Sequence, residues 1–186
     1  MPSRPPDDIT ITAYARLAGR PDAESALDAI FFEASNTKVF ATSDERAAFR
    51  ERWLGRYLRL DPQAAFLACD AAGSVAGYLV GSLDDPATTP RFDDVGYFHL
   101  LADLICHYPA HLHVNLAPAY RSRGIGGALI AAFAAHAHAR GAAGMHVVTS
   151  HGARNEGFYL RHGFAALRVF PWNGRDLVML GRPLAP

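Results

Sequence analysis

Residues 116–127, with the sequence Leu-Ala-Pro-Ala-Tyr-Arg-Ser-Arg-Gly-Ile-Gly-Gly, place glycines and arginines between two segments of regular periodicity. Residues 110–116 alternate as in a strand, and residues 126–140 have apolar side chains at helical spacing. At such a strand-to-helix junction, several backbone N–H groups point into one concavity at the positive end of the helix dipole. The sequence therefore predicts an anion site, to which Arg121 and Arg123 add charge-assisted contacts.

The glycine cluster alone leaves another explanation open. Glycine can serve a strand-to-helix turn through its backbone geometry, without any ligand. Two other phosphate-binding motifs fit the cluster less well, since a P-loop needs Gly-Lys followed by Ser or Thr, and the dinucleotide fingerprint needs a third glycine where Leu129 stands. The choice between a ligand site and a simple turn therefore depends on the rest of the chain.

The bulk composition is that of a globular protein. The chain has 186 residues, of which 50% are hydrophobic and 19% charged, and it has no apolar run long enough for a membrane span. We expect a single domain at residues 9–186, preceded by a flexible tail at residues 1–8. The formal net charge is zero and the arginines are scattered, which favours a small-molecule partner over nucleic acid or a membrane.

The N-terminus and the cysteines indicate a cytoplasmic protein. No apolar stretch follows the charged N-terminal residues, so a secretory signal is not expected. In a chain without an export signal, Cys69 and Cys106 are expected to be buried reduced thiols rather than a disulfide. The sequence leaves the oligomeric state open.

Periodicity predicts alternating strands and helices along the whole chain. Strands are expected at residues 9–14, 65–69, 75–80, 110–116, 145–149, 165–170 and 177–180. Helices are expected at residues 22–35, 43–60, 94–107, 126–140 and 155–161. Ser43 is the expected N-cap of the second helix, and Asn173-Gly174 signals a two-residue hairpin turn. This element order describes a mixed α/β sandwich.

The predicted strand at residues 110–116 has one apolar and one polar face. The polar side chains are His111, His113 and Asn115. One face is expected to pack in the core, while the other can face a ligand. A histidine there can act as a general base near neutral pH, and we choose His113, with a hydrogen-bonded structural histidine as the alternative. His111 and His113 also have the spacing of two metal ligands, but no third ligand can be assigned, so no metal site is predicted.

The glycine cluster and its lead-in resemble the signature of the GNAT acyltransferase superfamily. That signature is an aliphatic residue (Leu116), any residue, Pro118, two residues, Arg or Gln (Arg121), two residues, Gly124, any residue, and Gly or Ala (Gly126). The resemblance implies a largely antiparallel twisted sheet of about six to seven strands, with helices on both faces and a splayed central strand pair. It implies acetyl-CoA as co-substrate, with Leu116 against pantetheine. The residues implied to hold the pyrophosphate are Arg121, Ser122, Arg123, Gly124, Ile125, Gly126 and Gly127.

A second stretch, residues 158–164, resembles the family's motif of Phe-Tyr, three residues and Gly-Phe. It follows the first motif in the correct order, which makes coincidence a poor explanation for both. Attack by an amine on a thioester expels a CoA thiolate, and a nearby phenol can protonate it. Tyr159 is therefore the expected general acid, and packing its ring and hydrogen-bonding the cofactor is the alternative.

Two departures from the family pattern affect the remaining site residues. The family usually has an Asn seven residues before the Tyr, where this chain has Gly152. Asn155 is the nearby candidate for a cofactor contact, and a helix N-cap is an equally good interpretation of it. Many family members also use a carboxylate on the central strand to take the proton from the acceptor, and this strand has none.

The resemblance implies an N-acetyltransferase that moves the acetyl group directly from acetyl-CoA to a small-molecule or peptide amine. The alternative is a non-catalytic acetyl-CoA sensor or interaction domain, which the absent strand carboxylate favours. A narrower resemblance points the same way, since residues 111–116 and the Phe-Tyr helix are similar to the acetyltransferase-like C-terminal domain of the animal O-GlcNAc hydrolase. The acceptor cannot be identified from the sequence.

Overall fold

The computed structural model describes residues 5–17 and 21–184, so residues 1–4 of the predicted tail lie outside it. The chain divides into two compact units. The first unit comprises residues 1–81 and 113–133, and the second comprises residues 82–112 and 134–186. The expectation of a single domain stays a prediction.

The chain forms a mixed α/β fold with a seven-stranded, mostly antiparallel sheet, which confirms the predicted fold class. The strand order is β1-β2-β3-β4-β5-β7-β6. The strands are β1 (Ile9–Ala13), β2 (Phe66–Asp70), β3 (Val75–Ser82), β4 (Ala110–Leu116), β5 (Gly144–Ser150), β6 (Ala165–Trp172) and β7 (Arg175–Pro183). The α-helices are α1 (Pro21–Ala34), α2 (Ser43–Arg50), α3 (Arg56–Leu60), α4 (Tyr97–Leu100), α5 (Ala102–Ile105), α6 (Ile125–Ala139) and α7 (Arg154–Arg161).

In the first unit, β1, β2 and β3 pair in antiparallel fashion, and β2 and β3 form the predicted hairpin. The predicted helix at residues 43–60 begins as expected, but its N-cap is Thr42 rather than Ser43. The Oγ1 atom of Thr42 accepts a hydrogen bond from the backbone N–H of Glu45 at 3.1 Å. Ser43 is the first helical residue, because a hydroxyl one position earlier can already satisfy the orphan N–H group.

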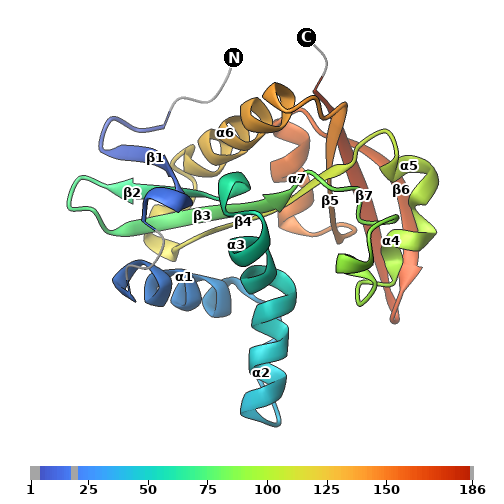
Figure 1. Ribbon diagram of the computed structural model, residues 1–186, viewed down its shortest axis with the longest axis horizontal. Coiled ribbons are helices and arrows are strands. Elements are labelled where there is room, and N and C mark those ends of the chain that lie inside the picture. Colours follow the sequence, from blue (N-terminus) through green and yellow to red (C-terminus); the bar gives the residue numbers. More distant parts are fainter. Residues whose placement is uncertain (1–4, 18–20, 185–186) are drawn as a thin grey trace. The chain divides into compact units, whose positions relative to one another are not determined.

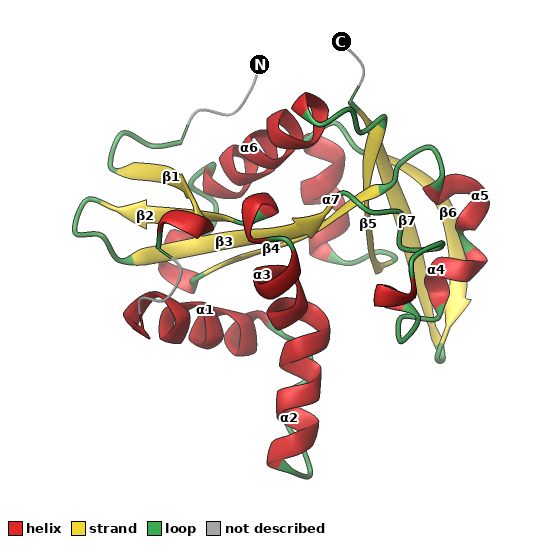
Figure 2. Cartoon of the chain, in the orientation of Figure 1, coloured by secondary structure: helices red, strands yellow, loops and turns green. Residues whose placement is uncertain are grey.

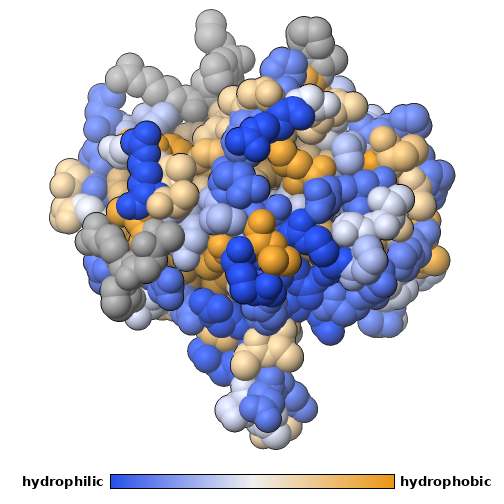
Figure 3. All heavy atoms as spheres, viewed as in Figure 1, coloured by the Kyte–Doolittle hydropathy of each residue, from blue (hydrophilic) through white to orange (hydrophobic). Residues whose placement is uncertain are grey.

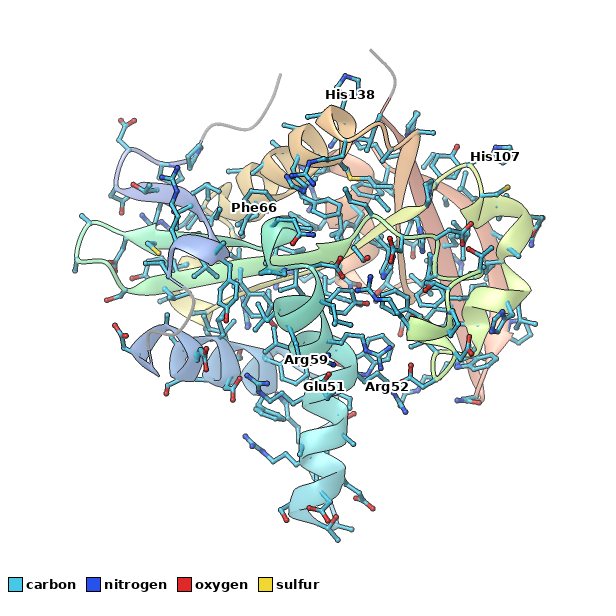
Figure 4. The ribbon with its side chains drawn as sticks, in the orientation of Figure 1. Glu51, Arg52, Arg59, Phe66, His107 and His138 are labelled. Atoms are coloured by element: carbon cyan, nitrogen blue, oxygen red, sulfur yellow. The ribbon has the colours of Figure 1, made fainter. Side chains whose placement is uncertain are left out.

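The same helix contains a π-helical turn at Glu51–Gly55, between α2 and α3, where the N–H of Arg56 bonds the carbonyl of Glu51. α2 projects away from the strands of the first unit (Figure 1), and none of its residues is buried. Figure 3 shows mainly hydrophilic side chains at the tip of this projection, with some apolar ones among them. Arg59 pairs with Glu51 on its exposed side (Figure 4). The π-helical turn therefore lies where the helix passes from the surface into the core, at the buried Leu54 and Tyr57.

β3 and the end of β4 approach each other closely at Gly77. A Cβ atom added there would lie 2.2 Å from the Cδ2 atom of Leu116 and 2.7 Å from the carbonyl oxygen of Asn115. Any side chain at this position would push β4 away from β3. Gly77 therefore sets the position of the last residues of β4, which carry the candidate site.

In the second unit, β5, β7 and β6 lie side by side (Figure 2), with β7 antiparallel to both neighbours. The β6–β7 hairpin turns at Asn173 and Gly174, which have φ values of 48° and 73°. Two successive positive φ angles are the geometry of the predicted two-residue turn. The β4–β5 ladder contains two residue pairs, Ala110 with Met145 and His111 with His146. A ladder this short is what the predicted splayed central pair requires.

The predicted helix at residues 94–107 is wrong in its extent, because it is broken into α4 and α5. Leu101 lies between them with φ −116° and ψ 9°, outside the helical region, and its side chain is completely buried. Burial of Leu101 therefore coincides with the break in the helix. Of the two cysteines, Cys69 is buried as predicted, whereas Cys106 is exposed, and both are free thiols. No helix in the described part of the chain is long and apolar enough to cross a membrane.

Candidate functional site

The segment between β4 and α6, residues 117–124, forms a loop in the first unit with two residues in left-handed backbone conformations. Ser122 has φ 62° and Gly124 has φ 80°. A Cβ atom placed on Gly124 would meet no heavy atom of the described residues within 4 Å, so this side of the loop is open. Side chains larger than glycine are strained at this φ, and the open space beside it can admit a ligand.

The N-terminus of α6 directly follows the loop. The backbone N–H of Ala128 bonds the carbonyl of Gly124 at 3.2 Å, and helix geometry gives the three preceding N–H groups no acceptor within the helix. Those groups belong to Ile125, Gly126 and Gly127, and the helix dipole adds partial positive charge there. The open space at Gly124 and these donors together fit a pyrophosphate.

Both arginines of the loop are engaged in ion pairs within the first unit. Arg121 donates through Nε to the carbonyl of Leu116 at 3.0 Å and pairs with Glu33 of α1. Arg123 pairs with Asp8 at 2.7 Å. The guanidinium groups therefore shape the loop, and their predicted contact with pyrophosphate stays a prediction.

Tyr120 provides another anchor for the loop. Its hydroxyl donates to the carboxylate of Asp70, at the end of β2, at 2.6 Å. This hydrogen bond lowers the pKa of Asp70 and raises the pKa of Tyr120, because it favours the charged carboxylate and the neutral phenol. The loop is thus tied to the β2–β3 hairpin through one side chain and to α1 through another.

A pocket of about 330 Å³ lies in the first unit, where three segments of the chain meet. α1 and the residues after it contribute Phe31 and residues 34–37, and the helix that contains the π-helical turn contributes Phe49 and Trp53. β4 contributes His113 and Asn115, two of the residues predicted for the catalytic site. These two residues of the polar face therefore line a pocket, and their catalytic roles stay predictions.

His113 is held on the pocket wall by two aromatic residues. The Tyr57 hydroxyl and His113 Nε2 are 3.2 Å apart, within hydrogen-bond distance. The imidazole ring lies edge-on to Trp53 and Tyr57, with ring centroids 5.4 Å and 5.3 Å away. Such contacts fix the ring orientation that a proton acceptor needs.

Asn115 is fixed by the strand beside it. Its Nδ2 atom donates to the hydroxyl of Tyr78, on β3, at 2.9 Å. Tyr78 is completely buried, and burial raises the pKa of its phenol, so the hydroxyl is a neutral partner. The amide of Asn115 is therefore locked in place at the pocket wall.

His111 differs from the expectation for the polar face of β4. It belongs to the second unit, where it is 2% exposed and packs against Phe92, Phe98 and His146. The ring centroids of His111 and Phe92 are 4.7 Å apart. This half of the polar face is sealed in an aromatic cluster and is not available to a ligand.

The two predicted residues after β5, Asn155 and Tyr159, lie on α7 in the second unit. Tyr159 is buried between the rings of Phe158 and Phe164, and burial raises its pKa. The Nδ2 atom of Asn155 donates to Thr149 Oγ1 at 2.7 Å. The N-cap interpretation of Asn155 is wrong, since Ala153 occupies that position and has no side chain to cap with. The predicted cofactor contacts of both residues stay predictions.

The pocket also contains residues that sequence reasoning did not place there. Trp53 shares an apolar helical spacing with buried Tyr57, and such a spacing is more typical of core residues than of a pocket wall. A π-helical turn changes the face on which the following residues lie, so a regular 3.6-residue pattern misplaces a side chain in it. No local pattern in the sequence marks the π-helical turn or places Trp53 at a pocket.

Residues 25–164 match a family model described as the acetyltransferase (GNAT) family. No significant match was found among curated proteins. The crystal structure of SsHAT is similar, with 25% sequence identity, a TM-score of 0.72, and coverage of 96% of this chain and 100% of that chain.

Two further solved structures share the fold at lower identity. A GCN5-related N-acetyltransferase from Kribbella flavida is 20% identical, with a TM-score of 0.65 and coverage of 96% of this chain and 99% of that one. A chain of the NatC complex bound to Gag peptide and CoA is 13% identical, with a TM-score of 0.66 and the same coverage.

Proposed function

Because the chain belongs to the acetyltransferase (GNAT) family, whose co-substrate is acetyl-CoA, we propose that it is an N-acetyltransferase that transfers the acetyl group directly to an amine. One observation supports this most. The first unit alone contains an open glycine loop at a helix N-terminus and a pocket with a histidine in its wall, and residues 113–116 of β4 join the two. A cofactor loop and an acceptor pocket on one strand are what direct transfer requires.

The loop is the proposed pyrophosphate site. The backbone N–H groups of residues 122–127 act as the donors, while Arg121 and Arg123 hold the loop in shape through Glu33 and Asp8. Bound acetyl-CoA supplies an activated thioester carbonyl. Leu116, whose carbonyl already accepts from Arg121, lies at the end of the strand where pantetheine is expected. Preorganised donors of this kind need little rearrangement when an anion binds.

His113 is the proposed general base. It lines the pocket, its ring is oriented by Tyr57 and Trp53, and it can accept the proton that an ammonium group must lose before attack. Asn115, locked by Tyr78, is proposed to orient the acceptor through a hydrogen bond. No side chain needs to form a covalent intermediate.

Tyr159 is the proposed general acid for the departing thiolate, on the strength of the family resemblance. Burial raises the pKa of the phenol, so Tyr159 is protonated at neutral pH, as a proton donor must be, although the same shift makes it a weaker acid. Tyr159→Phe removes the proton and leaves the ring, so turnover is expected to fall while acetyl-CoA binding is unchanged. An unchanged turnover would remove the assigned role.

The cofactor half of the proposal is tested with a matched pair of glycine variants. Gly124 and Gly73 both have φ near 80°, and a Cβ on either meets no heavy atom of the described residues within 4 Å. Gly124→Val and Gly73→Val should therefore suffer similar backbone strain, of about 1–2 kcal/mol. Only Gly124→Val should lose the thermal shift that acetyl-CoA produces in the wild type.

The transfer half is tested by following free thiol while the protein is incubated with acetyl-CoA and a panel of primary amines. The proposal predicts thiol release that depends on both the protein and one class of amine. Acetyl-CoA binding with no thiol release for any amine would contradict a transferase and leave a non-catalytic acetyl-CoA-binding domain. No thermal shift with acetyl-CoA would contradict both.

A further inference from the structure

The acceptor pocket of the first unit is nearly free of formal charge. Of the described residues that line it, His113 is the one side chain able to carry a charge, and the others are aromatic, amide, hydroxyl or alanine groups. An acceptor with several ammonium groups, such as a polyamine or an aminoglycoside, would find no carboxylate in the wall to pair with its charges. The carboxylate of an amino acid would find no cation there other than a protonated His113.

The carboxylates closest in sequence to the lining residues of α1 are already paired. Asp28 pairs with Arg50 at 2.7 Å, and Glu33 pairs with Arg121. Each arginine cancels most of the field that its carboxylate would project into the pocket. The surroundings of the pocket therefore add little attraction for a polycation.

Aromatic rings make up the apolar part of the wall. Phe31 and Phe49 contact each other, with ring centroids 5.4 Å apart and an interplanar angle of 38°. Trp53, at the π-helical turn, adds a third ring next to His113. Flat aromatic ligands gain about 0.5–1.5 kcal/mol per ring contact beyond the burial of area.

The polar end of the pocket suits a single amine. His113 and Asn115 both come from β4, and both are held by buried tyrosines, Tyr57 and Tyr78. A volume of about 330 Å³ is small for a ligand pocket and matches one ring with a short amine-bearing chain. The pocket thus has an apolar aromatic part and a polar part with one candidate base.

Resting on the proposed transferase function, we infer that the acceptor is an arylalkylamine that carries one amine and no other charge. Its ring packs against Phe31, Phe49 and Trp53, and its amine lies at His113 and Asn115. In the reaction, the amine nitrogen forms a bond to the acetyl carbon as the bond from that carbon to sulfur breaks. The ammonium gives one proton to His113 before attack, and the nitrogen loses a second proton as the amide forms. The thiolate takes up one proton through Tyr159, so the products are a neutral amide, CoA and one proton released to solvent.

The inference is tested with a panel of phenethylamine, tryptamine, hexylamine, spermidine and kanamycin at fixed acetyl-CoA. The kcat/KM for the two aryl amines should exceed that for spermidine and kanamycin by about 10-fold or more, because the wall has aromatic rings for the former and no carboxylate for the extra charges of the latter. Hexylamine should fall between the two groups. A preference for spermidine or kanamycin would overturn the inference while leaving the transferase intact.

Variants of Trp53 supply the second arm. Trp53→Ala should raise KM for phenethylamine by about 10-fold with acetyl-CoA affinity unchanged, and Trp53→Phe should restore most of the loss. Arg59→Ala, an exposed position on the same helix, is the control. An equal effect of Trp53→Ala on all amines, or none on any, would contradict an aromatic acceptor site.

A binding measurement separates failure of this inference from failure of the proposed function. Calorimetry of phenethylamine with the CoA-saturated wild type should show binding that Trp53→Ala loses, even if no thiol is released. Binding without thiol release would sink the transferase and keep the aryl-amine site. Thiol release with another amine, without any phenethylamine binding, would keep the transferase and contradict the aryl-amine site.

Discussion

His111 and His113 stand two residues apart on the same strand, yet they lie in opposite surroundings. His111, in the second unit, is enclosed by Phe92, Phe98 and His146. His113, in the first unit, lines a pocket and meets the hydroxyl of Tyr57. Strand alternation places both side chains on one face, but what covers that face is decided by segments far away in the sequence. One histidine is thus a packing residue, and the other is available for chemistry.

The largest effect expected from this comparison is on stability. His111→Ala removes a side chain that is 2% exposed in an aromatic cluster, so the free energy of unfolding should fall by about 3 kcal/mol through cavity formation. His113→Ala, at a half-buried position on a pocket wall, should lower it by about 1–2 kcal/mol, including the hydrogen bond to Tyr57. Urea unfolding of the two variants measures the difference. Equal losses would mean that the two sites are packed alike.

The next largest effect is expected on the pH dependence of stability. It arises at His146, which packs against His111 in the second unit. Burial, opposed in part by the hydrogen bond to the Tyr108 carbonyl and by Asp85, lowers the pKa of His146 to about 4. Between that value and the unfolded value near 6.5, the unfolded state binds the extra proton, so stability falls as the pH falls. The loss attributable to this group between pH 7 and pH 5 is about 2 kcal/mol.

The measurement compares wild type with His146→Asn, which keeps a donor for the Tyr108 carbonyl. Unfolding free energies at pH 7 and pH 5 should change less in the variant than in the wild type. His138→Asn, at an exposed position of α6, is the control and should follow the wild type. Parallel pH curves for all three proteins would show that His146 does not resist protonation.

A smaller effect is expected at Tyr57, the residue that orients His113. Tyr57→Phe removes the hydroxyl at 3.2 Å from His113 Nε2, so stability should fall by about 1 kcal/mol and kcat should fall several-fold. Tyr14→Phe is the matched control, because it removes a buried tyrosine hydroxyl that bonds Glu24 instead. Stability and steady-state kinetics distinguish the two variants. A similar kcat for both would show that Tyr57 does not position the base.

The order of elements was predictable because it depends on local patterns. Alternation located β4, helical spacing located α6, and Asn173-Gly174 located the last turn. Prediction was wrong where tertiary packing overrode the local pattern, as at Leu101, which breaks a continuous helical spacing into α4 and α5. The exposure of Cys106 likewise had no local signal in the sequence.

The glycine loop was predictable for the same local reason, but the partners of its arginines were not. Glu33 and Asp8 are far from Arg121 and Arg123 in the sequence, and nothing in a single sequence pairs them. The pocket was even harder to predict than these ion pairs, because its wall combines α1, the π-helical turn and β4, which are far apart in the sequence. Of its lining residues, only His113 and Asn115 belonged to a pattern that suggested a ligand.

The central claim is that His113 acts as the base in a pocket that shares a strand with the cofactor loop. The most direct test is the kcat of His113→Ala with acetyl-CoA and the best amine of the panel, with and without added imidazole. We expect kcat to fall by about 100-fold or more, acetyl-CoA affinity to be unchanged, and imidazole to restore part of the rate. An unchanged kcat, or a lost rate that imidazole does not restore, would contradict the claim.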